Sequence, residues 1–418
     1  MIDLLPFRGL RYDPAVVGDV GRVLAPPYDV IAEAEREQLH QSHPQNIIRL
    51  ILGRPQPSDG PAENVYSRAA ATFADWRARQ ILRRDAHPAI YLYEQTFTSD
   101  GRQCRRLGFI ALLSLHEGAE GGVFRHEQTF QGPKTDREQL LQAVRANLSP
   151  IFCLYPDGSD GPIHRQLARL AESATPVIDV QVRGERDRLW LVTDPGPIEA
   201  LQAAMRPKQV IIADGHHRYE VALANRRLSP AVMAYFGWLE DPAMVVLPIH
   251  RLVPMGQAHA LETMEARLSR CVQLASVSEP ETLFLMLEAG RNEVGLFGFY
   301  ARGQYRLLRL QSTEVERSLA QHGVPAAWST LDVALLHYVL LPHLANGQSV
   351  AQWQITYTKD AREAVQWARG GDDRVAFLLN PVPVARIQEV ALQGHRLPQK
   401  STYFYPKVPS GLVINPFD

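Results

Sequence analysis

Residues 207–226 read PKQVIIADGHHRYEVALANR, a stretch in which an apolar run meets a dense polar group. The run from Val210 to Ala213 is typical of a buried strand, and the residues from Tyr219 onward have the character of a helix. Between them lie Asp214, Gly215, His216, His217 and Arg218. The order of strand, glycine turn and helix places several phosphate-binding, metal-binding or titratable side chains at one junction.

The beginning of a helix at this turn predicts an anion site. Its first backbone N–H groups have no partner within the helix, and the helix dipole adds partial positive charge. Arg218 and the imidazoles of His216 and His217 add further donors. Asp214 is a candidate N-cap that accepts a backbone N–H of either histidine. The alternative is a structural turn that carries two surface histidines. A metal ion shared by the two histidines is disfavoured, because neighbouring residues on a helix point about 100° apart.

Composition narrows the class of protein. The chain has 418 residues and 45% hydrophobic content, enough for two or three domains with cores of their own. The net charge of -1 provides no global field for nucleic acid or an anionic membrane. The three cysteines are scattered, as in a reducing cytoplasm, and neither a signal peptide nor a membrane-spanning run is found. We therefore expect a soluble cytoplasmic protein, whose oligomeric state the sequence leaves open.

A second polar group precedes the first. In HEQTFQGPKTDR, residues 126–137, Glu127 is followed closely by Lys134 and Arg137. A carboxylate near several cations suggests a general base or a magnesium ligand. The alternative is a solvated loop of mixed charge. Thr135 and Glu138 have the spacing of a capping box, which predicts a helix over 136–147. The next residues, SPIFCLY, predict a buried strand.

Two further segments carry polar or aromatic groups. In PQKSTYFYPK, residues 398–407, Lys400 and Lys407 could close over a polyphosphate while Tyr403 and its neighbours stack on a base. The alternative is a C-terminal arm that packs its aromatic rings on the core. In APPYDV and HPQNIIRL, residues 25–30 and 43–50, the pattern favours a structural role for Asn46 and leaves Asp29 and Arg49 undecided.

These motifs together resemble one protein family over essentially the whole chain. The family is the bacterial and archaeal one catalogued as domain of unknown function 1015. The matching pieces are APPYDVI, HPQNIIRL, YLYEQTF, HEQTFQGPKTDREQLLQAVRANLSPIF, IIADGHHRYEVAL, YTKDAREA and LPQKSTYFYPKVPSGLVINP. They are specific to the family, but the family has no assigned activity.

A more distant resemblance suggests a function. The order of the His-Glu strand, the helix, SPIFCLY and VIIADGHHRYEVAL is similar to the ParB–sulfiredoxin superfamily. Its free-serine kinases carry a similar Asp-Gly-His-His-Arg signature and an upstream His-Glu whose Glu is the catalytic base. The resemblance thus implies ATP or ADP at Asp214–Arg218, Mg²⁺ held by Asp214 and Glu127, Glu127 as base, and His216 and His217 as catalytic partners of the phosphate. The small kinases lack the insertion at 156–206, which puts serine in doubt as the acceptor.

The resulting expectation is an α+β, mixed-sheet, multi-domain protein with a ParB/sulfiredoxin-like core. We expect an N-terminal α+β domain over 1–118, the core over 119–240, and a C-terminal α+β domain with a basic, aromatic arm over 241–418. The expected activity is nucleotide-dependent phosphoryl transfer to a small hydroxyl metabolite, with Lys400 as a closing cation. The alternative is a regulatory protein that binds a nucleotide at the same site without turnover.

Overall fold

The computed structural model describes residues 1–418 except 117–120, 128, 130, 256–260, 346–348 and 351–352. The chain forms two compact units. Unit 1 comprises Met1–Arg125, Thr129–Val245 and Pro406–Asp418, and unit 2 comprises His126–Gln128 and Val246–Tyr405. The expected boundary between 118 and 119 lies outside the described residues. The segments on either side of it share one sheet in unit 1, so they do not form the two separate domains expected.

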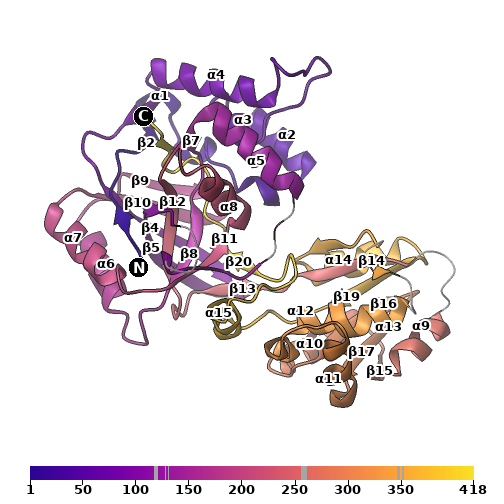
Figure 1. Ribbon diagram of the computed structural model, residues 1–418. Coiled ribbons are helices and arrows are strands. Elements are labelled where there is room, and N and C mark those ends of the chain that lie inside the picture. The colour runs from indigo at the N-terminus through magenta and orange to yellow at the C-terminus, as the bar shows by residue number, and fades with distance from the viewer. Residues whose placement is uncertain (117–120, 128, 130, 256–260, 346–348, 351–352) are drawn as a thin grey trace. The chain divides into compact units, whose positions relative to one another are not determined.

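Unit 1 is built on a nine-stranded mixed sheet (Figure 1). The strand order is β6-β11-β8-β12-β5-β4-β10-β9, with β1 paired to β5. The pairs β11–β6 and β12–β8 are parallel, whereas β11–β8, β12–β5 and β4–β5 are antiparallel. The expected α+β class with a mixed sheet is therefore confirmed. The strands of unit 1 are β1 (Leu4–Leu5), β2 (Leu10–Tyr12), β3 (Leu82–Arg84), β4 (Ile90–Ser99), β5 (Arg102–Ser114), β6 (Val123–Arg125), β7 (Ala146–Asn147), β8 (Ile151–Tyr155), β9 (Ile178–Val182), β10 (Glu185–Val192), β11 (Val210–Asp214), β12 (Ala231–Trp238) and β21 (Asn415–Pro416).

Helices cover this sheet and add a cluster beside it. The apolar core at the large sheet includes Phe109, Phe236 and Tyr155, all fully buried. Helices α3, α4 and α5 form a connected group, and α5 also contacts α8 (Figure 1). The helices are α1 (Pro14–Val17), η1 (Val20–Arg22), η2 (Tyr28–Val30), α2 (Glu33–Ser42), α3 (Ile48–Ile51), α4 (Val65–Ala78), α5 (Gln131–Val144), α6 (Pro162–Glu172), α7 (Pro195–Met205) and α8 (His216–Ala224).

The insertion at 156–206 extends the large sheet. It forms α6, β9, β10 and α7, and β10 pairs with β4 in antiparallel register. The helix expected over 136–147 has other bounds in the structure, because α5 begins at Gln131 and ends at Val144. Pro133 does not delay the start, since the first turn of a helix needs no N–H donor at that position. Thr135 therefore lies within the helix, and the expected capping box is wrong.

Unit 2 holds a six-stranded sheet in the order β15-β17-β16-β19-β14-β18. Its registered pairs are all antiparallel. A second core, which includes Leu283, Leu307 and Leu378, lies against this sheet. The elements are β13 (Val245–Leu247) at the junction, then β14 (His250–Pro254), α9 (Leu261–Leu268), β15 (Val272–Val277), α10 (Pro280–Ala289), β16 (Leu296–Ala301), β17 (Gln304–Leu310), α11 (Ser312–Gln321), η4 (Ala326–Thr330), α12 (Asp332–Leu335), the π-helical η5 (Leu336–Leu340), α13 (Leu341–Ala345), β18 (Thr356–Thr358), α14 (Ala361–Arg369), β19 (Arg374–Leu378), α15 (Val384–Leu392) and β20 (Tyr403–Tyr405).

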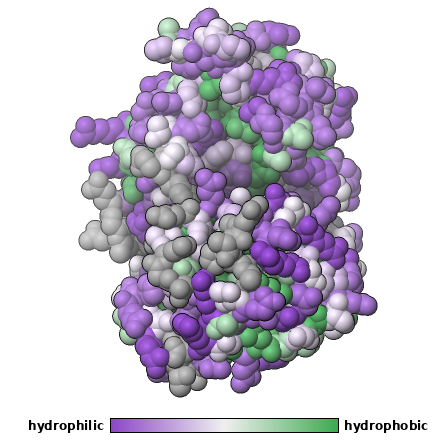
Figure 2. All heavy atoms as spheres, turned by 90° about the vertical axis from the view of Figure 1, so that its right-hand side faces the viewer, coloured by the Kyte–Doolittle hydropathy of each residue, from purple (hydrophilic) through white to green (hydrophobic). Residues whose placement is uncertain are grey.

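The surface and the helices agree in character. Hydrophilic residues cover most of the face drawn in Figure 2. Within the described part of the chain, no helix has both the length and the apolar character that crossing a bilayer requires.

Candidate functional site

The expected strand, glycine turn and helix are present in unit 1. β11 lies between β6 and β8, and all five of its residues are buried. Its last residue is Asp214, Gly215 turns the chain, and α8 begins at His216. His216 is buried and His217 is half-buried in the first turn of this helix.

Gly215 is needed at the turn for two reasons. Its φ of +86° lies in the left-handed region that side chains other than glycine rarely adopt. In addition, a Cβ atom at this position would lie 2.9 Å from a guanidinium nitrogen of Arg218. A side chain would therefore strain the backbone and displace Arg218.

Asp214 binds two cations. Arg218 donates from Nη2 to Oδ2 at 2.7 Å, and the ammonium of Lys407 bonds to Oδ1. Arg218 also donates from Nη1 to the carbonyl of Pro150. The expected N-cap role of Asp214 is wrong, because Gly215 is the cap residue and α8 has no side-chain cap. The carboxylate is instead taken up by the two cations.

The Asp214 centre, which comprises Asp214, Arg218, Lys407 and His216, has more positive than negative groups. Burial opposes ionisation of Asp214, but Lys407 and Arg218, with a further contribution from His216, outweigh it and lower the pKa of its carboxyl. The side chains of Lys407 and Arg218 are only 8% and 13% exposed. One carboxylate thus faces two permanent cations and a titratable imidazole at the beginning of a helix. This balance favours an anionic ligand.

Buried polar groups on two central strands hold the arm that carries Lys407. Arg106 on β5 donates to the carbonyl of Pro406 at 2.6 Å and to the side chain of Gln95. Gln95 on β4 donates to the carbonyl of Lys407 at 3.2 Å. Both side chains are fully buried. The sequence interpretation missed these two residues, although Glu94-Gln95 within an aromatic strand was a visible signal of buried polar groups.

The two cations expected near Glu127 lie on α5 in unit 1. Lys134 pairs at 3.2 Å with Glu220 of α8, which also binds Arg125 and the hydroxyl of Thr129. Arg137 donates to the carbonyl of Ile51 at 2.9 Å and pairs with Asp136. Lys134 thus joins α5 to α8, whereas Arg137 lies at the edge of a pocket.

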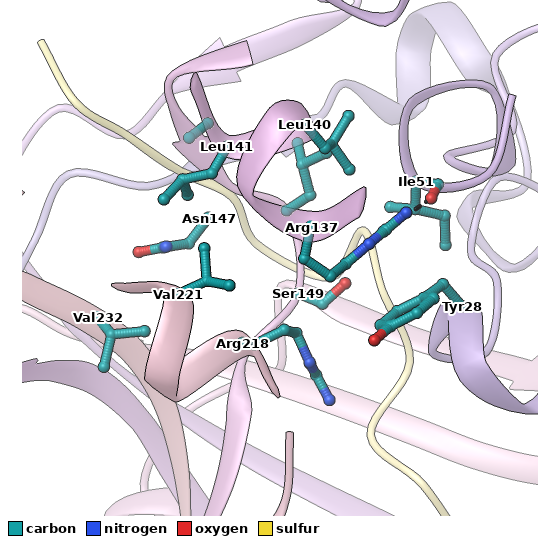
Figure 3. Close-up of a pocket in the computed structure, with 12 residues that line it drawn as sticks. Tyr28, Ile51, Arg137, Leu140, Leu141, Asn147, Ser149, Arg218, Val221 and Val232 are labelled. Atoms are coloured by element: carbon teal, nitrogen blue, oxygen red, sulfur yellow. Dashed lines mark hydrogen bonds between the residues drawn. The ribbon is translucent and has the colours of Figure 1, made fainter. Parts of the chain in front are cut away.

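That pocket lies in unit 1, between α5 and α8, with an empty volume of about 520 Å³. Arg218 is part of its lining (Figure 3). The first N-terminal motif contributes Tyr28, and Ile51, which directly follows the second motif, also lines the pocket. The guanidinium carbon of Arg137 lies 3.9 Å from the centre of the Tyr28 ring. Burial raises the pKa of Tyr28 to about 12.

The remaining polar residues of the N-terminal motifs have other positions. Asn46 donates to the carbonyls of Arg22 and Leu24 and accepts from the N–H of Ile48. The structural role favoured for Asn46 is thus confirmed. Arg49 donates to the carbonyl of His40 at 2.9 Å, and Asp29 is exposed.

The other expected site residues belong to unit 2. Glu127 accepts the backbone N–H of Ser401 at 2.7 Å, and the carbonyl of Lys400 accepts from Arg251 at 2.9 Å. Tyr403 lies on β20, with the ammonium of Lys359 4.7 Å from its ring centre. Arg251 is 1% exposed, and burial lowers its pKa to about 10. A shared cleft for Glu127, Lys400 and the Asp214 centre stays a prediction.

The donor set at Asp214 does not suit a magnesium ion. Both carboxylate oxygens already bind a cation. Among the residues that the structure describes, no group of three or more His, Cys, Asp or Glu side chains could hold a metal ion.

Comparison with known proteins identifies the family. Residues 4–334 match the family described as "Protein of unknown function (DUF1015)". The chain belongs to this family. No curated protein matches it.

Solved structures similar to this chain include a free serine kinase in complex with AMP, at 13% identity and a TM-score of 0.35, covering 68% of this chain and 83% of that one. SbnI from Staphylococcus aureus, solved with a C-terminal truncation, matches at 12% identity and a TM-score of 0.36, over 72% and 85% of the two chains. A conserved hypothetical protein from Pyrococcus furiosus matches at 11% identity and a TM-score of 0.36, over 69% and 90%. The family expected from the motifs is confirmed.

Proposed function

We propose that this protein binds a nucleoside polyphosphate at the beginning of α8 and transfers a phosphoryl group to the hydroxyl of a small metabolite. The observation that carries the proposal is the group of cations around Asp214. Lys407 and Arg218 are largely shielded from solvent, oriented and held by one carboxylate, next to the first N–H groups of a helix. Phosphate is the common biological ligand of such a site.

The residues at this centre have distinct roles in the proposal. The N–H groups of His216 and His217 and the dipole of α8 bind the phosphates. Arg218, Lys407 and the two imidazoles stabilise the charge that develops on the transferred group, which is what phosphoryl transfer mainly requires of a protein. Asp214 orients Arg218 and Lys407 and does not react.

The proposed base is Glu127. The backbone N–H of Ser401 holds its carboxylate, and a held carboxylate can accept the proton of an attacking hydroxyl. Free L-serine is the first acceptor to test, because the chain resembles free-serine kinases. Lys400, next to Ser401, remains the candidate for a closing cation.

Binding and turnover are tested separately. Calorimetry with ADP and ATP measures binding, and mass spectrometry follows phosphoserine formed from L-serine with each nucleotide, with and without Mg²⁺. Lys407→Met should weaken nucleotide binding by about 10- to 100-fold, since a buried charge contact to phosphate is lost. Lys208→Met is the matched control, because Lys208 pairs with Asp157 elsewhere in unit 1.

Glu127→Gln should abolish turnover and leave binding unchanged. Loss of binding in this variant would contradict the role of Glu127 as base. Bound nucleotide that stays intact with serine and with a panel of hydroxyl metabolites would favour the regulatory alternative. If the wild-type protein binds neither nucleotide, the proposed function is wrong.

A further inference from the structure

The pocket beside α8 differs in chemistry from the Asp214 centre. Most of its wall is aliphatic, from α5, α8, β12 and the segment between α5 and β8. Figure 3 shows Val221 and Val232 on one side and Tyr28 and Arg137 on the other. We propose that this pocket takes the nucleobase of the nucleotide whose phosphates bind at the beginning of α8. The inference rests on the proposed function and adds to it the part of the ligand that is recognised.

The pocket continues from the phosphate site along one helix face. Arg218 belongs to both, because it pairs with Asp214 and also lines the pocket. Val221 lines the pocket three residues later, which places it on the same face of α8, about 4.5 Å further along the axis. A ligand with its phosphates at the helix start can therefore extend an attached group along this face into the pocket.

The walls suit a flat, largely apolar group. Seven aliphatic side chains line the space: Ile51, Leu140, Leu141, Ala146, Leu148, Val221 and Val232. A small hydroxyl metabolite has too little apolar surface to use such walls, whereas a heteroaromatic ring buries both faces against them. The hydroxyl acceptor is therefore the less suitable occupant.

Asn147 supplies a polar contact for a base edge. It is 7% exposed, and its amide oxygen accepts the N–H of Met233 and the amide of Asn415, each at 3.1 Å. These two donors determine the orientation of the amide. Its NH₂ group has no hydrogen-bond partner among the described residues. A ring nitrogen or a carbonyl of a base would accept a hydrogen bond from this group.

The opposite wall is held in place. Arg137 is fixed by Asp136 and by the carbonyl of Ile51, and its guanidinium lies against the Tyr28 ring. A preformed wall of this kind loses little conformational freedom when a ligand binds. It also gives a reason for the position of Tyr28 in the first N-terminal motif.

The test compares a nucleotide with a phosphate that has no base. Calorimetry should show that ADP binds at least about 10-fold more tightly than inorganic pyrophosphate, which corresponds to about 1.4 kcal/mol. Leu141→Phe narrows the pocket and should remove this advantage while pyrophosphate binding is unchanged. Leu223→Phe, the same substitution on α8 outside the pocket lining, should alter neither affinity. Thermal unfolding confirms that each variant is folded.

The outcomes separate the two proposals. Equal affinities of the wild-type protein for ADP and pyrophosphate would overturn the base pocket and leave the phosphate site intact. The base pocket is also overturned if Leu141→Phe weakens pyrophosphate as much as ADP, or if it leaves the ADP advantage unchanged. Binding of neither ligand would overturn the proposed function itself.

Discussion

Two buried aspartates of the same sheet differ in their ionisation. Asp214 ends β11 and binds Lys407 and Arg218, which lower its pKa against the effect of burial. Asp187 on β10 is 1% exposed, and burial raises its pKa to about 7. Its hydrogen-bond partner, the hydroxyl of Tyr93, is neutral. The difference shows that burial alone does not determine the charge of a carboxyl group, because full charges beside it outweigh the loss of solvent.

The two aspartates have different consequences for ligands. Asp214 is ionised and holds two cations in place, which prepares a site for an anion. Asp187 lacks a cation in direct contact among the described residues, so it carries little charge below neutral pH. Of the two aspartates, only Asp214 is suited to organise a phosphate site.

The largest expected effect comes from removing the charge of Asp214. Asp214→Asn should lower the free energy of unfolding by about 3 kcal/mol, because Lys407 and Arg218 remain buried without a counter-charge. Asp179→Asn, which breaks an exposed pair with Arg186, should cost less than about 1 kcal/mol. Urea unfolding at pH 7 measures both. Similar small effects would mean that Asp214 does not compensate the two cations.

The pH dependence of stability should have opposite signs at the two residues. The folded-state pKa of Asp187 is raised, so its contribution is fully present below about pH 4 and is lost as the pH rises to about 7. Asp187→Asn should therefore gain stability relative to wild type across this window, by up to about 4 kcal/mol. The contribution of Asp214 should be present above about pH 4 and be lost at lower pH.

Urea titrations of wild type, Asp187→Asn and Asp214→Asn at several pH values test this comparison. A constant difference between wild type and Asp187→Asn from pH 4 to pH 7 would mean that Asp187 is ionised throughout that window.

Gly215 tests the Asp214 side of the comparison, because a side chain at this position would displace Arg218. Gly215→Ala should cost about 2 kcal/mol, since it combines a left-handed backbone with a close approach of its Cβ to the guanidinium. Gly184→Ala has a similar φ of +83° but no atom within 4 Å of its Cβ, so it should cost about 1 kcal/mol. Equal costs in thermal or urea unfolding would remove the role assigned to the close approach.

The smallest effect is expected at Gln95, which lies between Asp187 and the arm that carries Lys407. Its side chain helps to lower the pKa of Asp187 against the effect of burial, and it donates to the carbonyl of Lys407 at 3.2 Å. Gln95→Met should cost about 1 kcal/mol through the lost hydrogen bonds, and it should weaken ADP binding modestly by loosening the arm. ADP affinity that is unchanged would show that the bond from Gln95 is not needed to hold the arm in place.

Sequence patterns predicted the elements of the site better than its contacts. The strand–glycine–helix order at 210–224 and the strand SPIFCLY were predicted, because apolar periodicity and a glycine at a turn are local signals. The cap assigned to Asp214 and the capping box at Thr135 were wrong. Neither local rule accounts for what the structure shows. Asp214 bonds to two cations, and the helix begins earlier, at Gln131.

The sequence by itself determined the family, the mixed α+β class and the junction that carries the polar residues. These depend on residue order and short-range periodicity. Only the tertiary structure decided that Lys407, 193 positions after Asp214, bonds to its carboxylate, and that Tyr28 and Ile51 line a pocket with α5 and α8. The physical reason is that contacts between distant segments depend on strand order and on buried side chains such as Arg106 and Gln95. A linear pattern does not encode either directly.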